Sequence, residues 1–139
     1  MTAEAKILIV DDEEVIRRSY LRALAGERCN VTATTNGSDA LKMMGDQAFD
    51  VVLLDQRMPG MDGMAVLKTI KANWPESEVI MITGYPAVES AKEAVMLGAY
   101  DYLAKPVGPD EVIEAANGAM THKRWALRCD EAEPATCRG

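Results

Sequence analysis

The chain has 139 residues, a formal net charge of −7 and a hydrophobic fraction of 48%. This length suits one domain with a buried core, and the apolar fraction is too high for a disordered chain. The acidic balance argues against direct binding of nucleic acid or of an anionic membrane surface, because basic clusters make those contacts. The apolar run at residues 7–10 is too short for a bilayer span or a signal peptide, so we expect a cytoplasmic protein.

Short apolar segments alternate with amphipathic segments along the whole chain. Five β-type runs are predicted, at residues 6–10, 29–34, 51–54, 79–82 and 100–104. Each is followed by a helical pattern with one apolar face, at residues 15–24, 40–44, 64–74, 87–95 and 112–120. Pro75 ends the third helix, Gly98 closes the fourth, and Pro109 begins the fifth.

Strands that read as near-continuous apolar runs are typical of a parallel sheet covered by helices on both faces. We therefore predict an α/β doubly wound fold of the flavodoxin-like type. It would contain a five-stranded parallel sheet of order 2-1-3-4-5 flanked by five helices. Residues 1–125 form the predicted domain. The periodicity stops near Ala126, and residues 126–139 are interpreted as a flexible tail or the start of a linker.

Polar residues stand directly after four of the predicted strands. They are Asp11 and Asp12 after the first strand, Asp55 after the third, Thr83 after the fourth and Lys105 after the fifth. Ligands of open α/β sheets bind outside the carboxyl ends of the strands. In the predicted order the first and third strands are neighbours, about 4.8 Å apart, so three carboxylates should meet at one edge.

Three carboxylates in one crevice repel one another unless a proton or a cation relieves the repulsion. Oxygen ligands favour Mg²⁺, whereas zinc lacks ligands because His122 is the only histidine. A carboxylate beside a metal, an ammonium and a hydroxyl can attack a phosphoryl group and form an aspartyl-phosphate. Each of these residues alone would more often be a turn, a cap or solvated surface. Their joint position at one sheet edge is what predicts the site.

Four segments carry these residues: ILIVDDE at 7–13, LDQRMPGMDG at 54–63, ITG at 82–84 and GAYDYLAKP at 98–106. Together and in this order they resemble the receiver domain of bacterial two-component response regulators. The resemblance spans residues 6–123 and is strongest to receivers attached to AAA+ transcriptional activators. It implies a signalling phosphoacceptor that catalyses only its own phosphorylation and dephosphorylation, rather than an enzyme acting on other substrates.

The resemblance also implies roles for single residues. Asp55 would be phosphorylated by a sensor histidine kinase or a phosphotransfer protein, with Mg²⁺ as cofactor. Asp12, Asp55 and the backbone carbonyl of Arg57 would ligate the ion directly, and Asp11 mainly through water. We expect each of these residues to lie at the same sheet edge.

The remaining implied roles concern the phosphoryl group and its readout. Lys105 would pair with the phosphoryl group, and Thr83 would hydrogen-bond it. Tyr102 would change rotamer with Thr83, and the bond between Lys105 and Pro106 would be cis. The face made by the fourth helix, the fifth strand and the fifth helix would then bind a partner protein or a second receiver, forming a homodimer.

Two positions beside the site are expected to set the lifetime of the phosphoryl group. They are Arg57, two residues after Asp55, and Tyr85, two residues after Thr83. Arg57 would either pair with a phosphoryl oxygen or offset the charge of the acidic cluster, and the sequence does not decide between these.

Three other functions were weighed. A phosphatase of the haloacid dehalogenase type needs a second acid two residues after its nucleophile, where this chain has Arg57. A flavin or nucleotide carrier needs a glycine-rich or hydroxyl-rich turn after the first strand, where this chain has Asp-Asp-Glu. A receiver-like scaffold that is never phosphorylated would not need the complete set of acids, hydroxyl and lysine.

Overall fold

The computed structural model describes residues 5–58 and 60–131, with side chains as far as Lys123. Five parallel strands form its main sheet, in the order β2-β1-β3-β6-β7. These strands are β1 (Ala5–Val10), β2 (Cys29–Thr34), β3 (Val51–Asp55), β6 (Glu78–Thr83) and β7 (Asp101–Ala104). The helices are α1 (Glu14–Leu24), α2 (Gly37–Asp46), α3 (Gly63–Asn73), α4 (Val88–Met96) and α5 (Pro109–Glu131). Counted among these five strands alone, the order is the predicted 2-1-3-4-5.

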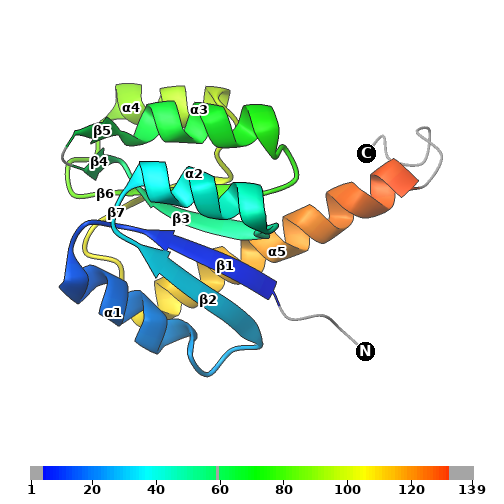
Figure 1. Ribbon diagram of the computed structural model, residues 1–139, viewed down its shortest axis with the longest axis horizontal. Helices are drawn as coiled ribbons and strands as arrows, with labels where there is room; N and C mark the ends of the chain where they lie inside the picture. The colour runs from blue at the N-terminus through cyan, green and yellow to red at the C-terminus, as the bar shows by residue number, and fades with distance from the viewer. Residues whose placement is uncertain (1–4, 59, 132–139) are drawn as a thin grey trace.

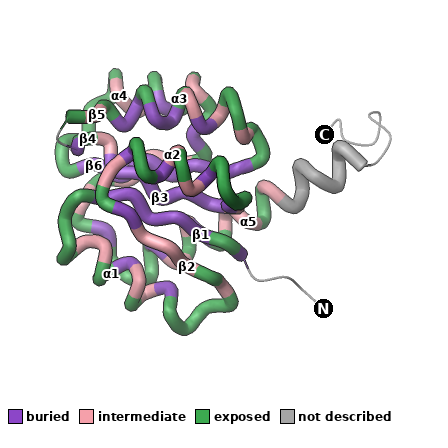
Figure 2. Tube along the Cα trace, in the orientation of Figure 1, coloured by how far each residue is buried: buried purple, intermediate pink, exposed green. Residues whose placement is uncertain are grey.

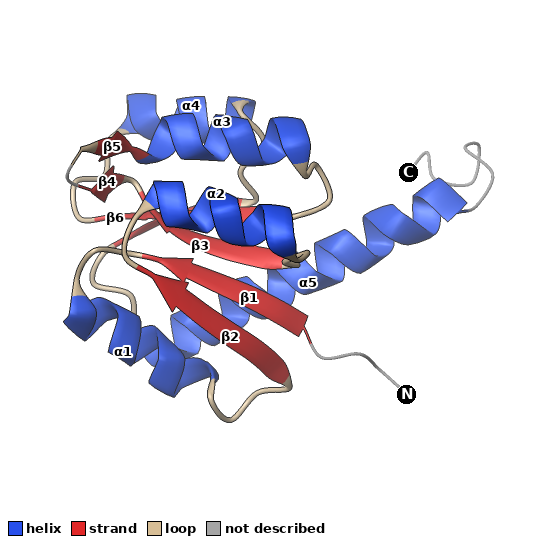
Figure 3. Ribbon diagram, in the orientation of Figure 1, coloured by secondary structure: helices blue, strands red, loops and turns tan. Residues whose placement is uncertain are grey.

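The sheet lies between two layers of helices. Figures 1 and 3 show α2, α3 and α4 over one face, and α1 and α5 over the other. Successive strand residues alternate between the two cores: Leu8 and Val52 pack under α2 to α4, whereas Ile7 and Val51 pack under α1 and α5. Both faces are therefore buried, which explains why the strands lack a polar alternation. Figure 2 shows the buried residues concentrated along the central strands.

A short hairpin follows β3 that the sequence did not predict. It consists of β4 (Arg57–Met58) and β5 (Met61–Asp62), which pair antiparallel. Gly60 supplies the positive φ of its turn, at 75°. Strands of two residues are too short to show a period, so no hydrophobic pattern could reveal them.

Helix α5 is longer than the sequence indicated. It continues to Glu131, beyond the apolar stripe predicted at residues 112–120. Lys123 anchors it to the sheet through Asp50, with 2.5 Å between Nζ and Oδ1, and His122 contacts Glu78. Good helix formers such as Lys, Arg, Ala and Leu sustain the helix where the apolar stripe has stopped. Residues 132–139 of the expected tail lie outside the described part of the chain. Within the described part, no helix is long and apolar enough to cross a membrane.

Gly63 allows the start of α3 to approach the end of β3 closely. A Cβ at this position would lie 2.6 Å from the Asp55 carbonyl oxygen and 2.7 Å from the Gln56 Cα. We predict that Gly63→Ala lowers the free energy of unfolding by about 1–3 kcal/mol, because the backbone beside Asp55 must move. Urea unfolding measures this change.

The matched control is Gly45→Ala in α2, where nothing lies within 4 Å of an added Cβ. Alanine there should stabilise the helix by about 0.5–1 kcal/mol. Equal effects of the two substitutions would contradict the close approach at Gly63.

Candidate functional site

The ends of four adjacent strands bring the predicted site residues together. Asp55 is the last residue of β3, and Thr83 is the last residue of β6. Asp11 and Lys105 directly follow β1 and β7. Asp11, Asp55 and Thr83 are buried, at 2%, 4% and 0% exposure. The site therefore lies at the carboxyl edge of the sheet, where the strand order reverses between β1 and β3.

The three carboxylates converge as expected from the strand order. One ligand oxygen from each of Asp11, Asp12 and Asp55 lies within 4.8 Å of the others. Asp12 is exposed, whereas the other two are buried. Backbone amides hold the buried pair: the Glu13 N–H donates to Asp11 Oδ1 at 2.9 Å, and the Arg57 N–H donates to Asp55 Oδ1 at 3.3 Å.

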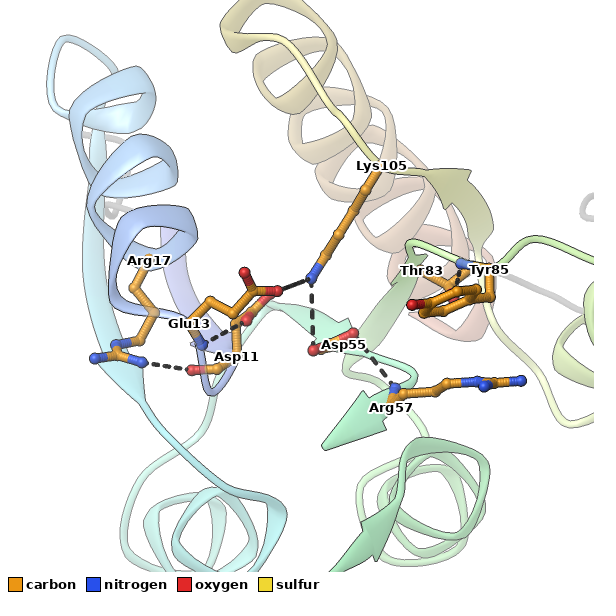
Figure 4. A network of polar contacts seen from close by, with 8 residues as sticks. All are labelled: Asp11, Glu13, Arg17, Asp55, Arg57, Thr83, Tyr85 and Lys105. Atoms are coloured by element: carbon orange, nitrogen blue, oxygen red, sulfur yellow. Dashed lines mark hydrogen bonds and ion pairs between the residues drawn. The ribbon is translucent and has the colours of Figure 1, made fainter. Parts of the chain in front are cut away.

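Lys105 is the cation among these acids, as Figure 4 shows. Its Nζ lies 3.0 Å from Asp11 Oδ2 and 3.5 Å from Asp55 Oδ2. A third carboxylate, that of Glu13, lies at 3.5 Å. The run Asp-Asp-Glu at residues 11–13 is the sequence signal for this third acid, but position alone predicted no role for Glu13.

The charges of this cluster shift its proton affinities. Burial, followed by the negative charge of Asp11, raises the pKa of Asp55 from 3.8 to about 6, against the opposing effect of Lys105. Burial works to lower the pKa of Lys105, but its hydrogen bond to Asp11 and the nearby acids outweigh this and raise it. A buried carboxylate with a pKa this high is a poorly compensated anion.

The remaining predicted residues stand around Asp55. The Tyr85 N–H donates to the Thr83 hydroxyl at 3.0 Å. The Arg57 guanidinium lies over the Tyr85 ring, 4.9 Å from its centroid, and Figure 4 shows both beside Asp55. These two positions therefore contact each other, which the sequence could not indicate because they come from different loops.

Tyr102, the expected switch residue, is half-buried on β7. Its hydroxyl donates to Gln56 Oε1 at 2.9 Å. Gln56 was missed by the sequence analysis, because a glutamine next to an acid carries no distinctive signal. The peptide bond between Lys105 and Pro106 is cis, as the resemblance implied.

With this geometry established, comparison with known proteins identifies the family. Residues 7–117 match the family model of the response regulator receiver domain, so the chain belongs to that family. It is 40% identical over 116 residues to the DNA-binding transcriptional regulator NtrC of Escherichia coli K12, covering 84% of this chain and 25% of NtrC. It is 44% identical over 112 residues to the regulatory protein AtoC of the same organism, covering 81% and 24%.

Solved structures agree with the family. A crystal structure of NtrX from Brucella abortus is similar with a TM-score of 0.86 at 34% identity, over 92% of this chain and 29% of that one. The chain thus spans about a quarter of the length of the curated relatives just named. It is a receiver domain of the two-component class, a family of signalling phosphoacceptors rather than conventional enzymes, and such receivers bind Mg²⁺ at an acidic pocket.

The raised pKa of Asp55 leads to a prediction for the metal-free protein. A folded-state pKa of about 6 against 3.8 means that the folded state binds this proton more tightly than the unfolded state. Stability should therefore fall as the pH rises through this window. We predict that Asp55→Asn, which cannot ionise, raises the melting temperature at pH 8 by about 4 °C or more, equivalent to roughly 1 kcal/mol, and by much less at pH 4.

Calorimetry with a chelator present measures both values. The control is Asp46→Asn, at an exposed position on α2, which should change stability by at most about 0.5 kcal/mol at either pH. A gain for Asp55→Asn that is the same at both pH values would rule out the buried charge as its cause.

Proposed function

We propose that Asp55 is the phosphoacceptor of this receiver, and that its donor is a phosphohistidine on a sensor histidine kinase or a phosphotransfer protein. The observation that carries this is a buried carboxylate at the sheet edge whose Oδ2 lies 3.5 Å from Lys105 Nζ. In the transfer, an Asp55 oxygen forms a bond to phosphorus. The phosphorus–nitrogen bond of the donor breaks, and its electron pair stays on the imidazole nitrogen.

Asp11, Asp12 and Asp55 would hold Mg²⁺, together with the backbone carbonyl of Arg57. These residues fit the ion, because an all-oxygen set within 4.8 Å is what Mg²⁺ binds. The raised pKa of Asp55 also indicates a deficit of positive charge at this point. When bound, the ion neutralises the carboxylates and the phosphoryl oxygens. Asp11 already accepts bonds from Lys105 and Glu13, which suits its predicted contact through water.

Lys105 and Thr83 are the proposed contacts of the phosphoryl group. The Lys105 ammonium already lies between two acids, and a compact point charge suits a phosphoryl oxygen. The Thr83 oxygen accepts from Tyr85, which leaves its own O–H to donate. Thr83 ends β6, the neighbour of β3, and Lys105 follows β7, the next strand, so short side-chain movements would bring both to Asp55.

Helix α4, with β7 and α5, is the proposed output face. Phosphorylation adds close to two negative charges at one point, and an element that is loosely held can respond to them. Ala94 is the buried residue of α4. Three apolar side chains on this helix are exposed to 63–86%: Val88, Val95 and Met96. We propose that a partner protein or a second receiver covers them after phosphorylation, with Thr83 and Tyr102 linking this face to Asp55.

The chain is proposed to be the receiver part of a longer cytoplasmic regulator of the AAA+ activator type. The support is that NtrC is a transcriptional regulator of which this chain matches about a quarter. Residues 1–125 would be the receiver, and residues 126–139 would be a flexible tail or the start of a linker. Contact with DNA would belong to another part of such a protein, because this chain has a net charge of −7.

The first prediction of this function is a covalent phosphorylation. With Mg²⁺ and acetyl phosphate, the wild-type protein should gain about 80 Da, the mass of one aspartyl-phosphate. Asp55→Asn should gain nothing, and a chelator should abolish the gain because the acids cannot accept another negative charge alone. Intact mass spectrometry measures all three.

The control for this experiment is Asp50→Asn, which changes an acid on the opposite edge of the sheet that pairs with Lys123. This variant should be phosphorylated normally. A wild-type protein that never gains mass, or an Asp55→Asn variant that does, would overturn the assignment of Asp55.

The second prediction concerns the lifetime of the phosphoryl group. Because Arg57 stacks on Tyr85 beside Asp55, the pair should restrict the approach of water to Asp55. Tyr85→Ala should therefore speed dephosphorylation by about two- to fivefold, the equivalent of an exposed cation–π contact. The decay of the phosphorylated mass after removal of the donor measures the rate.

Tyr85→Phe keeps the ring and serves as the matched control, with an unchanged rate. Arg57→Ala should match Tyr85→Ala, and the double variant should add little. Fully additive effects would show that the two residues act separately, so that the stack would not explain the lifetime.

A further inference from the structure

A hydrogen bond joins the residue after the phosphoacceptor to the expected switch tyrosine. The Tyr102 hydroxyl donates to Gln56 Oε1 at 2.9 Å, across 46 positions of sequence. Gln56 follows Asp55 directly, and Tyr102 lies on β7. Strand β6 lies between β3 and β7 in the sheet, so this bond spans the end of β6.

The alternation of side chains explains why the two meet. Leu54 packs in the core under α2 to α4, and Tyr102 packs against the same core. Gln56 is two residues after Leu54, so its side chain points to the same face of the sheet as Leu54. Asp55 lies between them in sequence, so its side chain points to the other face. Asp55 and Gln56 are therefore neighbours in the chain whose side chains lie on opposite faces of the sheet. We call the hydrogen bond between Tyr102 and Gln56 the latch.

The backbone of Gln56 is held firmly. Its N–H donates to the Ile82 carbonyl at 3.0 Å, and its own carbonyl accepts from the Gly63 N–H at 2.8 Å. Gly63 packs closely against this segment, because a Cβ added to Gly63 would lie 2.7 Å from the backbone carbonyl oxygen of Gln56. An acceptor on a fixed backbone restricts the positions of the group that donates to it.

We propose that Gln56 is a positioning residue that holds Tyr102 in its half-buried position before any phosphoryl group reaches Asp55. Both side chains are partly shielded from water. One net hydrogen bond therefore favours this rotamer over a solvated one by about two- to tenfold. The consequence for signalling rests on the proposed function. Phosphorylation of Asp55 does not need to turn the Tyr102 side chain inward, so the remaining movements are those of Thr83 and α4.

The position of Tyr102 is tested by ¹⁹F NMR on protein labelled with 3-fluorotyrosine. Tyr→Phe variants assign the resonances, and spectra are recorded with and without Mg²⁺ plus beryllofluoride. In the wild type, the Tyr102 resonance should be single and should move little on adding these reagents. In Gln56→Leu it should shift or broaden without them, and should move toward the wild-type position when they are added.

Two further variants separate the latch from general packing. Gln56→Glu keeps an acceptor oxygen and should restore the wild-type resonance. Gln47→Leu makes the same change at an exposed position and should have no effect. The proposal is overturned if Gln56→Leu leaves the Tyr102 resonance unchanged, or if that resonance moves as far in the wild type as in the variant.

A double-mutant cycle gives an independent measurement. The double variant Gln56→Leu/Tyr102→Phe should change the unfolding equilibrium constant by less than the product of the two single effects. The difference should be a factor of about two to ten. Independent effects would overturn the latch. These measurements need no phosphorylated protein, so a failure of the proposed function, seen as no gain in mass with acetyl phosphate, is distinguishable from a failure of the latch.

Discussion

The structure depends on a balance of charge at one point. Asp55 and Asp11 are buried side by side, and Lys105 is the cation that reaches both. This single ammonium does not fully compensate two carboxylates, since the pKa of Asp55 remains raised to about 6. The folded domain therefore carries an excess of negative charge at this point, which a divalent cation can offset. Rigid strands on both sides prevent the acids from relaxing apart.

The sheet maintains this balance because its hydrogen bonds fix where each strand ends. β1, β3 and β6 are neighbours with an unbroken parallel register, in which Val10 pairs with Leu54 and Asp55 pairs with Ile82. The close approach of α3 at Gly63 then fixes the turn after Asp55. Movements of the site are consequently confined to side chains and loops. A small displacement there is passed on to the helices rather than absorbed by the sheet.

Helices α4 and α5, which cover opposite faces of the sheet, differ in how much of each is buried. Helix α5 buries Val112, Ala116 and Ala119 and is tied to the far edge through Lys123. Helix α4 buries Ala94 and exposes Val88, Val95 and Met96. A helix that buries few side chains can shift more readily than one that is well buried and anchored. The Gln56 to Tyr102 bond lies on the face of the sheet that α4 covers.

The sequence alone was sufficient for the fold and for most of the site. Continuous apolar strands separated by amphipathic helices leave one economical arrangement, a parallel sheet with both faces covered. Because the carboxyl ends of its strands share an edge, residues at those ends, from Asp11 to Lys105, had to meet there. The acidic residues, the hydroxyl and the lysine were readable because each stands directly after an apolar run.

Contacts between loops and between side chains were decided only by the tertiary structure. Three contacts join positions that share no sequence period. They are the ion pair of Glu13 with Lys105, the stacking of Arg57 on Tyr85, and the bond between Gln56 and Tyr102. The two-residue hairpin strands β4 and β5 and the length of α5 also escaped the hydrophobic pattern. Periodicity reports which face of an element is buried. It carries no information about which side chains meet beyond the ends of the elements, because that depends on how separate loops are packed in three dimensions.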